Sequence, residues 1–136
     1  PLTVAILDLD HFKTVNDSFG HLAGDMILRQ IGERIRTSVR PQDLVLRAGG
    51  EEFAVLLTDV DQESARDLAA RIQGVLGAPC ELPDQRMVKV TASIGGFCWT
   101  TGALSEERAT DAADKALYAA KAQGRDRAFF AERSAA

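Results

Sequence analysis

Residues 44–57 read Leu-Val-Leu-Arg-Ala-Gly-Gly-Glu-Glu-Phe-Ala-Val-Leu-Leu. Two short apolar runs flank a Gly-Gly step, a pattern that predicts a β-hairpin with its turn at the glycines. Glu51 and Glu52 follow the turn directly, and the glycines before them carry no side chain that would keep a ligand from the backbone. Adjacent carboxylates repel each other, so the two form either a solvated acidic turn or part of a cation site.

Length and composition indicate one globular domain. The chain has 136 residues, of which 46% are hydrophobic and 26% are charged. Its net charge of −4 provides no basic surface for a nucleic-acid polymer. We expect a cytoplasmic protein without direct membrane contact, because no apolar run is long enough to span a bilayer and no signal peptide opens the chain. Cys80 and Cys98 lack metal-ligand spacing.

Residues 2–10 form an aliphatic run that ends in aspartates. Its near-continuous apolarity predicts a central strand covered on both faces. In strand alternation Asp8 and Asp10 share a face with Val4 and Ile6, so carboxylates stand where the buried face reaches the strand end. A semi-buried carboxylate needs a partner, and Asp8 therefore either caps the next turn or coordinates a metal ion.

The following segment carries polar side chains that suit a nucleotide. Residues 11–21 read His-Phe-Lys-Thr-Val-Asn-Asp-Ser-Phe-Gly-His, which predicts a loop or a short helical turn. Lys13 could hold a phosphate, while Asn16 and Asp25 could read the edge of a guanine. Taken singly, Asn16 is also a turn former, and Asp25 is also a first-turn acid that suits the positive end of a helix.

Periodicity and capping residues predict the remaining elements. These are a helix that ends near Arg40-Pro41, a helix from Asp61 to Gly77, strands over 80–83 and 87–99, a helix from Ser105 to about Ala122, and a last strand over 127–131. Strands and helices that alternate in this way, together with hairpins, predict an α/β sandwich. Its central sheet should be mixed, mostly antiparallel and flanked by helices.

Together these motifs resemble the GGDEF domain family, whose enzymes are diguanylate cyclases. The matching segments are residues 8–13, 16–17, 20–21, 24–25, the signature at 49–53 in its Gly-Gly-Glu-Glu-Phe form, 90–95 and 113–125. The resemblance runs from Val4 to about Arg127. It implies the palm fold of nucleotidyl cyclases, which is ferredoxin-like, and a single GGDEF domain over 1–136.

The resemblance also implies a catalytic metal site. Asp8, Glu51 and the Leu9 carbonyl would hold two Mg²⁺ ions, or Mn²⁺ in their place, and Glu52 would be a further catalytic residue, as a ligand or a base. Hard Mg²⁺ prefers oxygen ligands, and a metal pair can activate a 3′-hydroxyl and stabilise charge at the α-phosphorus.

Substrate-binding residues follow from the same resemblance. They would be Phe12, Lys13, Asn16, Asp25, Lys121 and Arg125, of which Asn16 and Asp25 would read guanine and the three basic residues would hold phosphates. Lys121 and Arg125 are also four residues apart near a helix end, where basic side chains commonly complement the helix dipole.

Residues 40–43, Arg-Pro-Gln-Asp, match the Arg-x-x-Asp site at which many family members bind their product. A guanidinium and a carboxylate can jointly take a guanine or a phosphate, although Arg before Pro at a helix end is also common local chemistry. The resemblance implies product inhibition at Arg40 and Asp43, with Arg71 at the place of a second arginine.

The activity implied is the condensation of two GTP into cyclic di-GMP with release of two pyrophosphates. One Asn16–Asp25 pair accounts for one GTP, so we expect catalysis to need a homodimer. Two alternatives stay open: a catalytically silent cyclic di-GMP receptor and a GTP-sensing regulatory module.

Two departures from the family pattern are present. Members usually carry an Asp-x-Leu-Thr-Gly-Leu-x-Asn-Arg leader before the first strand, whereas this sequence begins at Pro1-Leu2. We therefore expect either a fragment or a short member that lacks the leader and any sensory domain. Asp126 stands where Asn is usual, which we expect to be benign.

Overall fold

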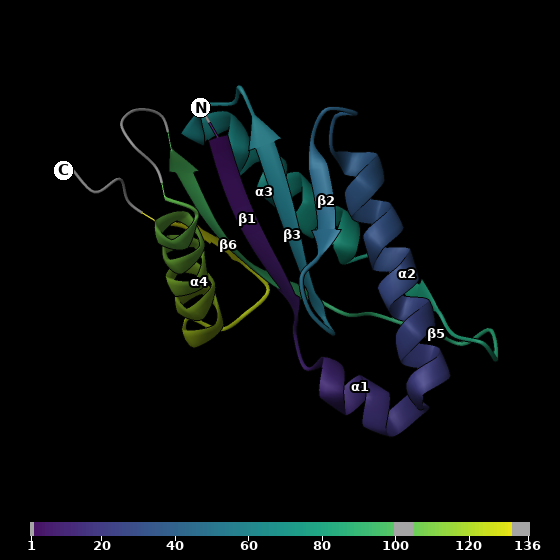
Figure 1. Cartoon of the computed structure of the whole chain (residues 1–136). Helices are drawn as coiled ribbons and strands as arrows, with labels where there is room; N and C mark the ends of the chain where they lie inside the picture. The colour runs from purple at the N-terminus through teal and green to yellow at the C-terminus, as the bar shows by residue number, and fades with distance from the viewer. Residues whose placement is uncertain (1, 100–104, 132–136) are drawn as a thin grey trace.

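The computed structural model describes residues 2–99 and 105–131. Figure 1 shows a twisted central sheet with α4 on one face and α2 and α3 on the other. The elements are β1 (Leu2–Leu9), α1 (Phe12–Phe19), α2 (His21–Ser38), β2 (Leu44–Arg47), β3 (Glu52–Thr58), α3 (Gln62–Leu76), β4 (Cys80–Glu81), β5 (Met87–Val88), β6 (Ala92–Trp99), α4 (Glu106–Ala122) and β7 (Ala128–Phe130).

The main sheet has the strand order β2-β3-β1-β6-β7. Strand β1 lies in the middle and pairs antiparallel with both β3 and β6. Strands β2 and β3 form the predicted antiparallel hairpin, while β6 and β7 pair in parallel. The sheet is therefore mixed and mostly antiparallel, and the aliphatic run at the start of the chain does form its central strand.

The larger core lies between the sheet and helices α2 and α3. Successive β1 side chains point to opposite faces, so Ala5, Leu7 and Leu9 enter this core while Ile6 faces α4. The isoleucines of α2 and the small and aliphatic residues of α3 complete the larger core; they are Ile27, Ile31, Ile35, Ala65, Ala69, Ile72 and Leu76.

Helix α4 packs directly on β6 because Gly95 has no side chain. A Cβ atom at Gly95 would lie 2.1 Å from the backbone nitrogen of Leu117 and 2.3 Å from the carbonyl oxygen of Ala113. Ala113 and Leu117 are both buried against Ile6 of β1. The close contact holds α4 over the sheet, and Lys121 lies in the last turn of this helix.

Two predicted caps are confirmed. Asp61 Oδ1 accepts a hydrogen bond from the Ser64 N–H at 2.7 Å, and Ser105 Oγ accepts one from the Arg108 N–H at 3.1 Å. These bonds satisfy N–H groups that have no partner inside their helices. None of the helices in the described ranges has the length and hydrophobicity that a bilayer-spanning helix requires.

Residues 12–19 differ from the prediction of a loop or short turn. They form the 8-residue helix α1, in which Phe12 is buried in the core. Val15 and Phe19 pack against the same core, so spacings of three and four residues place an apolar stripe on one helix face. The density of turn-forming polar residues concealed this stripe.

The predicted strand over 87–99 is wrong in its middle. Strand β5 pairs with β4 in a separate two-stranded sheet, and β6 begins only at Ala92. Asp10 explains the break, because its N–H donates to the Thr91 carbonyl at 2.8 Å and its carboxylate accepts from the Thr91 and Ser93 hydroxyls at 2.7 and 2.6 Å. The chain therefore passes from one sheet to the other at Thr91.

Candidate active site

Asp8 and Glu52 lie side by side at one end of the main sheet. In the strand register Asp8 is opposite Glu52 on β3 and opposite Ser93 on β6. Directly opposed residues of antiparallel strands point to the same face, with Cβ atoms about 4.5–5.5 Å apart. The two carboxylates therefore share the face covered by α4.

Lys121 is the cation that neutralises Asp8. Its Nζ atom lies 2.7 Å from Asp8 Oδ2, and the side chains of Lys121 and Asp8 are 33% and 12% exposed. The other carboxylate oxygen, Oδ1, is buried and has no hydrogen-bond partner among the described residues. Because an unpaired buried carboxylate oxygen is costly, Oδ1 is a ready ligand atom for a cation.

The hairpin tip places Glu51 beside β1. The Leu9 N–H donates to the Glu51 carbonyl at 3.3 Å, and the Ala48 and Gly49 N–H groups both donate to the Glu52 carbonyl, at 2.9 and 3.3 Å. These bonds close the Gly-Gly turn and bring Glu51 next to Leu9. The predicted metal-binding set of Asp8, Leu9 and Glu51 is thus gathered at one place, although its role stays a prediction.

Arg47 contributes to the tip in a way that sequence reasoning missed. Its Nη2 donates to the Gly50 carbonyl at 2.6 Å and its Nε to the Gly49 carbonyl at 3.3 Å. The guanidinium thus fixes the two carbonyls that precede Glu51. Its position directly before the turn was a usable signal, because an arginine fork can reach carbonyls two and three residues ahead.

Burial and neighbouring charges shift the pKa of Glu52. Its burial, together with the negative charges of Asp8, Asp114 and Glu51, raises the pKa of Glu52 above its ordinary value, while the Lys121 ammonium partly offsets this rise. Asp114 is an exposed residue of α4 that the sequence analysis did not assign to the site. A site with several carboxylates and one ammonium group favours the arrival of further cations.

Asn16 and Gly24 form a close pair between α1 and α2. A Cβ atom at Gly24 would lie 2.0 Å from Asn16 Oδ1 and 3.2 Å from Phe12 Cζ, so only glycine leaves room for the amide. Asn16 Oδ1 is buried and has no hydrogen-bond partner among the described residues. Asp25 follows Gly24 on α2 and is exposed. The two predicted base-reading residues therefore lie on adjoining helices.

The predicted basic residues are distributed around the site. Lys13 is exposed on α1, and Arg125 is exposed in the turn after α4. Arg125 and Asp126 have left-handed backbone angles, with φ of 62° and 46°. Asp10 Oδ2 accepts from the Asp126 N–H at 3.0 Å and holds this turn against the end of β1. Only Lys121 of the predicted phosphate ligands contacts a carboxylate of the site within the described residues.

The chemistry of the acidic group fits Mg²⁺. Within the parts of the chain that the structure describes, no group of three or more His, Cys, Asp and Glu side chains is placed to hold a metal ion. Mg²⁺ in nucleotide enzymes usually takes one or two carboxylates and completes its shell with water and substrate phosphates. Asp8, Glu51 and the Leu9 carbonyl offer that kind of open, all-oxygen set.

Arg40 and Asp43 form a second polar cluster away from this group. The Arg40 Nη2 and Nε atoms donate to the two Asp43 oxygens at 2.8 and 3.0 Å, and the Arg40 N–H also donates to Asp43 Oδ2 at 2.8 Å. Burial alone would raise the pKa of Asp43, but the hydrogen bonds and charge of Arg40 outweigh it and lower the pKa.

Arg40 and Asp43 differ in exposure, so they cannot both face a ligand as the sequence predicted. The Asp43 side chain is fully buried while that of Arg40 is 39% exposed, so Asp43 orients the arginine and only Arg40 faces outward. A hollow here is also lined by Arg36, which sequence reasoning missed. Arg71 Nη2 donates to the carbonyl of Ser38, two residues before Arg40, at 2.9 Å.

Comparison with known proteins identifies this arrangement. The family described as "Diguanylate cyclase, GGDEF domain" matches residues 1–127. The chain belongs to the GGDEF family. It is 45% identical over 129 residues to the probable diguanylate cyclase DgcT of Escherichia coli K12, a match that covers 93% of this chain and 28% of DgcT. The chain thus spans little more than a quarter of that relative.

Solved structures of GGDEF domains share the fold. The GGDEF domain of YfiN (TpbB) from Pseudomonas aeruginosa superimposes with a TM-score of 0.92 and 39% identity, covering 96% of this chain and 77% of that one. The GGDEF domain of DgcB from Caulobacter crescentus in complex with c-di-GMP gives a TM-score of 0.90 at 30% identity, covering 97% and 78%. The predicted palm fold is therefore confirmed.

Proposed function

We propose that this chain is a diguanylate cyclase domain that joins two GTP into cyclic di-GMP. Each 3′-oxygen forms a bond to the α-phosphorus of the other GTP, the bond from that phosphorus to the bridging oxygen breaks, and pyrophosphate leaves. The observation that carries the proposal is the Asp8 carboxylate, which has one oxygen on Lys121, one buried oxygen without a partner among the residues that the structure describes, and Glu52 beside it.

Asp8, Glu51 and the Leu9 carbonyl would hold two Mg²⁺ ions, or Mn²⁺ in their place, together with the triphosphate. The bound ions would polarise the α-phosphate and ease deprotonation of the 3′-hydroxyl. Glu52 has a raised pKa and stands next to Asp8, so it is suited to take up the hydroxyl proton. With a divalent ion bound at Asp8, Lys121 would be free to hold a phosphate oxygen.

Guanine is read at the joint between α1 and α2. The Asn16 amide has a buried oxygen there with no partner in the described part of the chain, and Asp25 offers an exposed carboxylate that can accept from the base N1–H and N2–H groups. Lys13 and Arg125 would meet the phosphates. One such pocket holds one GTP, so the second arrives on another copy of the chain, and the two-fold dimer supplies the proximity that the reaction needs.

Product inhibition is the second part of the proposal. Asp43 holds the Arg40 guanidinium in a fixed orientation beside a hollow, and the c-di-GMP complex of the DgcB GGDEF domain shows that a homologous domain binds this nucleotide. Arg40 would therefore present its outward edge to a guanine or phosphate of cyclic di-GMP, with Arg71 close by.

Incubation with GTP and Mg²⁺, followed by chromatographic identification of the nucleotide product, tests this function. Cyclic di-GMP should form with the wild-type chain and not with Glu51→Ala. A folded wild-type chain that binds cyclic di-GMP without producing it would instead establish the receptor alternative. Glu51→Ala with a near wild-type rate and an intact fold would show that the metal assignment is wrong.

A further inference from the structure

The β4–β5 hairpin is fastened to α2 by side chains at its base. The Gln30 side-chain amide pairs with both backbone groups of Glu81, as a neighbouring strand would. Its Nε2 donates to the Glu81 carbonyl at 2.8 Å, and its Oε1 accepts from the Glu81 N–H at 2.9 Å. Arg34 donates to the Ala78 and Pro79 carbonyls, both at 2.6 Å. The base of the hairpin is therefore fixed relative to the helix that carries Asp25.

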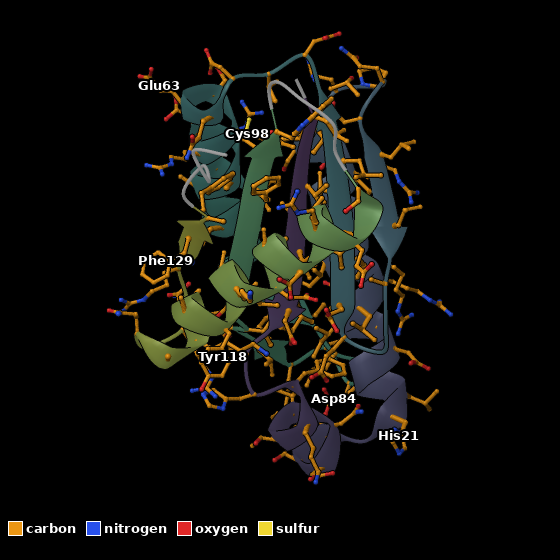
Figure 2. The ribbon with its side chains drawn as sticks, turned by 60° about the vertical axis from the view of Figure 1, so that its left-hand side comes forward. His21, Glu63, Asp84, Cys98, Tyr118 and Phe129 are labelled. Carbon is orange, nitrogen blue, oxygen red and sulfur yellow. The ribbon has the colours of Figure 1, made fainter. Side chains whose placement is uncertain are left out.

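The tip of the same hairpin reaches α1. Asp84 Oδ2 accepts from Arg86 Nε at 2.5 Å and Asp84 Oδ1 from the Arg86 N–H at 3.1 Å, which directs the arginine side chain. The guanidinium carbon of Arg86 then lies 5.1 Å from the centre of the Phe19 ring, within cation–π range. Figure 2, in which Asp84 is labelled, shows this tip beside the end of the molecule formed by α1 and α2.

Helix α1 has little local support of its own. It is 8 residues long, and its N-cap, His11, has a left-handed φ of 55° and makes no side-chain capping bond. The first turn holds no acidic residue and the last turn no basic one. An isolated helix of this length is unstable in water, so tertiary contacts must hold it in place. Asn16 lies on this helix, one turn before Phe19.

We propose that the β4–β5 hairpin positions the guanine-reading joint, and that Arg86 is the positioning residue, acting through Phe19. Gln30 and Arg34 tie the hairpin to α2, and Arg86 ties it to α1, so the hairpin sets the two helices relative to each other. This fixes Asn16 with respect to Asp25. The inference rests on the proposed function in that it takes these two residues as the base readers.

The test compares Arg86→Ala, Arg86→Lys and Phe19→Leu with a matched control. Arg66 on α3 is an equivalent arginine, because its guanidinium carbon lies 5.8 Å from the centre of the Phe130 ring, and Arg66→Ala is the control. The first readout is amide hydrogen exchange of α1, which needs no nucleotide. The second is the Kd for GTP by titration calorimetry, together with KM and kcat.

We expect Arg86→Ala to speed exchange of the α1 amides by about two- to fivefold and to weaken GTP binding by a similar factor. The value of KM should rise while kcat changes little. Arg86→Lys should reverse most of both changes, since an ammonium group over the face of an aromatic ring is also attracted to it. Arg66→Ala should change neither. Adding Arg86→Ala to Phe19→Leu should have no further effect, because both act through one contact.

Unchanged α1 exchange in Arg86→Ala, or full additivity with Phe19→Leu, would overturn the positioning role. Such a result would leave the cyclase proposal standing if the wild-type chain still forms cyclic di-GMP. Conversely, faster α1 exchange in a chain that forms no product would support the positioning of α1 and refute the cyclase.

Discussion

The Nζ atom of Lys121 lies 2.7 Å from Oδ2 of Asp8, although 113 positions separate the two residues in the chain. The contact joins a predicted phosphate ligand to a predicted metal ligand. Lys121 thus acts as the counter-ion of Asp8 in this structure, and a divalent ion at Asp8 would take over that role. The Lys121 ammonium would then pair with Asp8 before the ion binds and with a phosphate afterwards.

Replacing Lys121 by Met should make the stability of the domain depend on Mg²⁺. The buried Asp8 carboxylate loses its partner, so the free energy of unfolding should fall by roughly 1–3 kcal/mol in metal-free buffer. Added Mg²⁺ should recover more stability in Lys121→Met than in the wild type, because binding to the folded state stabilises it. Urea unfolding with and without MgCl₂ measures both effects.

Lys115→Met is the matched control on the same helix. Lys115 Nζ lies 3.0 Å from Asp111 Oδ2, but the two side chains are 78% and 62% exposed. Loss of this ion pair should lower the free energy of unfolding by less than about 0.5 kcal/mol, with no Mg²⁺ dependence. An identical Mg²⁺ response in Lys115→Met and Lys121→Met would contradict the counter-ion role.

Glu52→Gln should stabilise the metal-free domain, and by more as pH rises. Folding raises the pKa of Glu52, so between the ordinary and the raised pKa the folded state binds more protons at this group than the unfolded chain does. The stability that Glu52 contributes is therefore present at low pH and lost as pH rises through the folded pKa. Glu52→Gln has no carboxylate to ionise next to Asp8, so its free energy of unfolding does not fall in this way.

Urea unfolding of wild type and Glu52→Gln across a pH series measures this prediction. The gap between the two curves should open with rising pH and close below the ordinary pKa of a glutamate. Glu33→Gln, an exposed site on α2, removes the same formal charge and serves as control. A difference in unfolding free energy that stays constant with pH would contradict a raised pKa of Glu52 in the folded state.

Gly24→Ala should weaken GTP binding without unfolding the domain. The new methyl group would lie 2.0 Å from Asn16 Oδ1 and would force the amide out of its place. Loss of one base contact should raise the Kd for GTP about tenfold.

Gly74→Ala on α3 is the control, because nothing lies within 4 Å of its Cβ position. It should add about 0.5–1 kcal/mol of stability and leave the Kd unchanged. Equal affinities in the two variants, measured by calorimetry, would remove Asn16 from the pocket.

Arg40→Ala should bind cyclic di-GMP at least about tenfold more weakly, because a charged hydrogen-bond donor is lost from the hollow. The substitution also deprives the buried Asp43 of the guanidinium, although the backbone N–H of residue 40 still donates to it. Arg40→Lys is therefore a second variant, which keeps a positive charge near Asp43 but loses the planar fork. Both should bind product weakly in calorimetric titrations, whereas Arg29→Ala, on an exposed position of α2, should not. Wild-type affinity in Arg40→Lys and Arg40→Ala alike would place the product elsewhere.

Much of the fold could be predicted because it depends on local signals. The Gly-Gly turn between apolar runs specifies the β2–β3 hairpin, and side-chain caps such as Asp61 mark helix starts. The break before β6 had no local signal, because it depends on hydrogen bonds from Thr91 and Ser93 to Asp10, far away in sequence. Helix α1 was underestimated because its stability comes from burial of Phe12 in the core.

The sequence provides candidate residues for the site, whose roles stay predictions, but only part of the contacts between them. The family resemblance implied roles for Asp8, Glu51 and Lys121, but no sequence pattern places Lys121 next to Asp8. Arg47 on the turn carbonyls and Asp43 as a buried orienting group also depend on side-chain directions that only the folded chain specifies. Contacts between distant segments are the part that sequence patterns leave open.

The most direct measurement is the specific activity of the purified domain against its own concentration, with GTP and Mg²⁺ saturating and cyclic di-GMP quantified. We expect the rate per chain to climb with concentration, because two GTP-loaded copies must meet, and fusion to a constitutive dimeriser should raise it in dilute solution. Asp8→Ala should give no product at any concentration. A flat line from a demonstrated monomer, or cyclic di-GMP from Asp8→Ala at the wild-type rate, would contradict a two-chain cyclase built around Asp8.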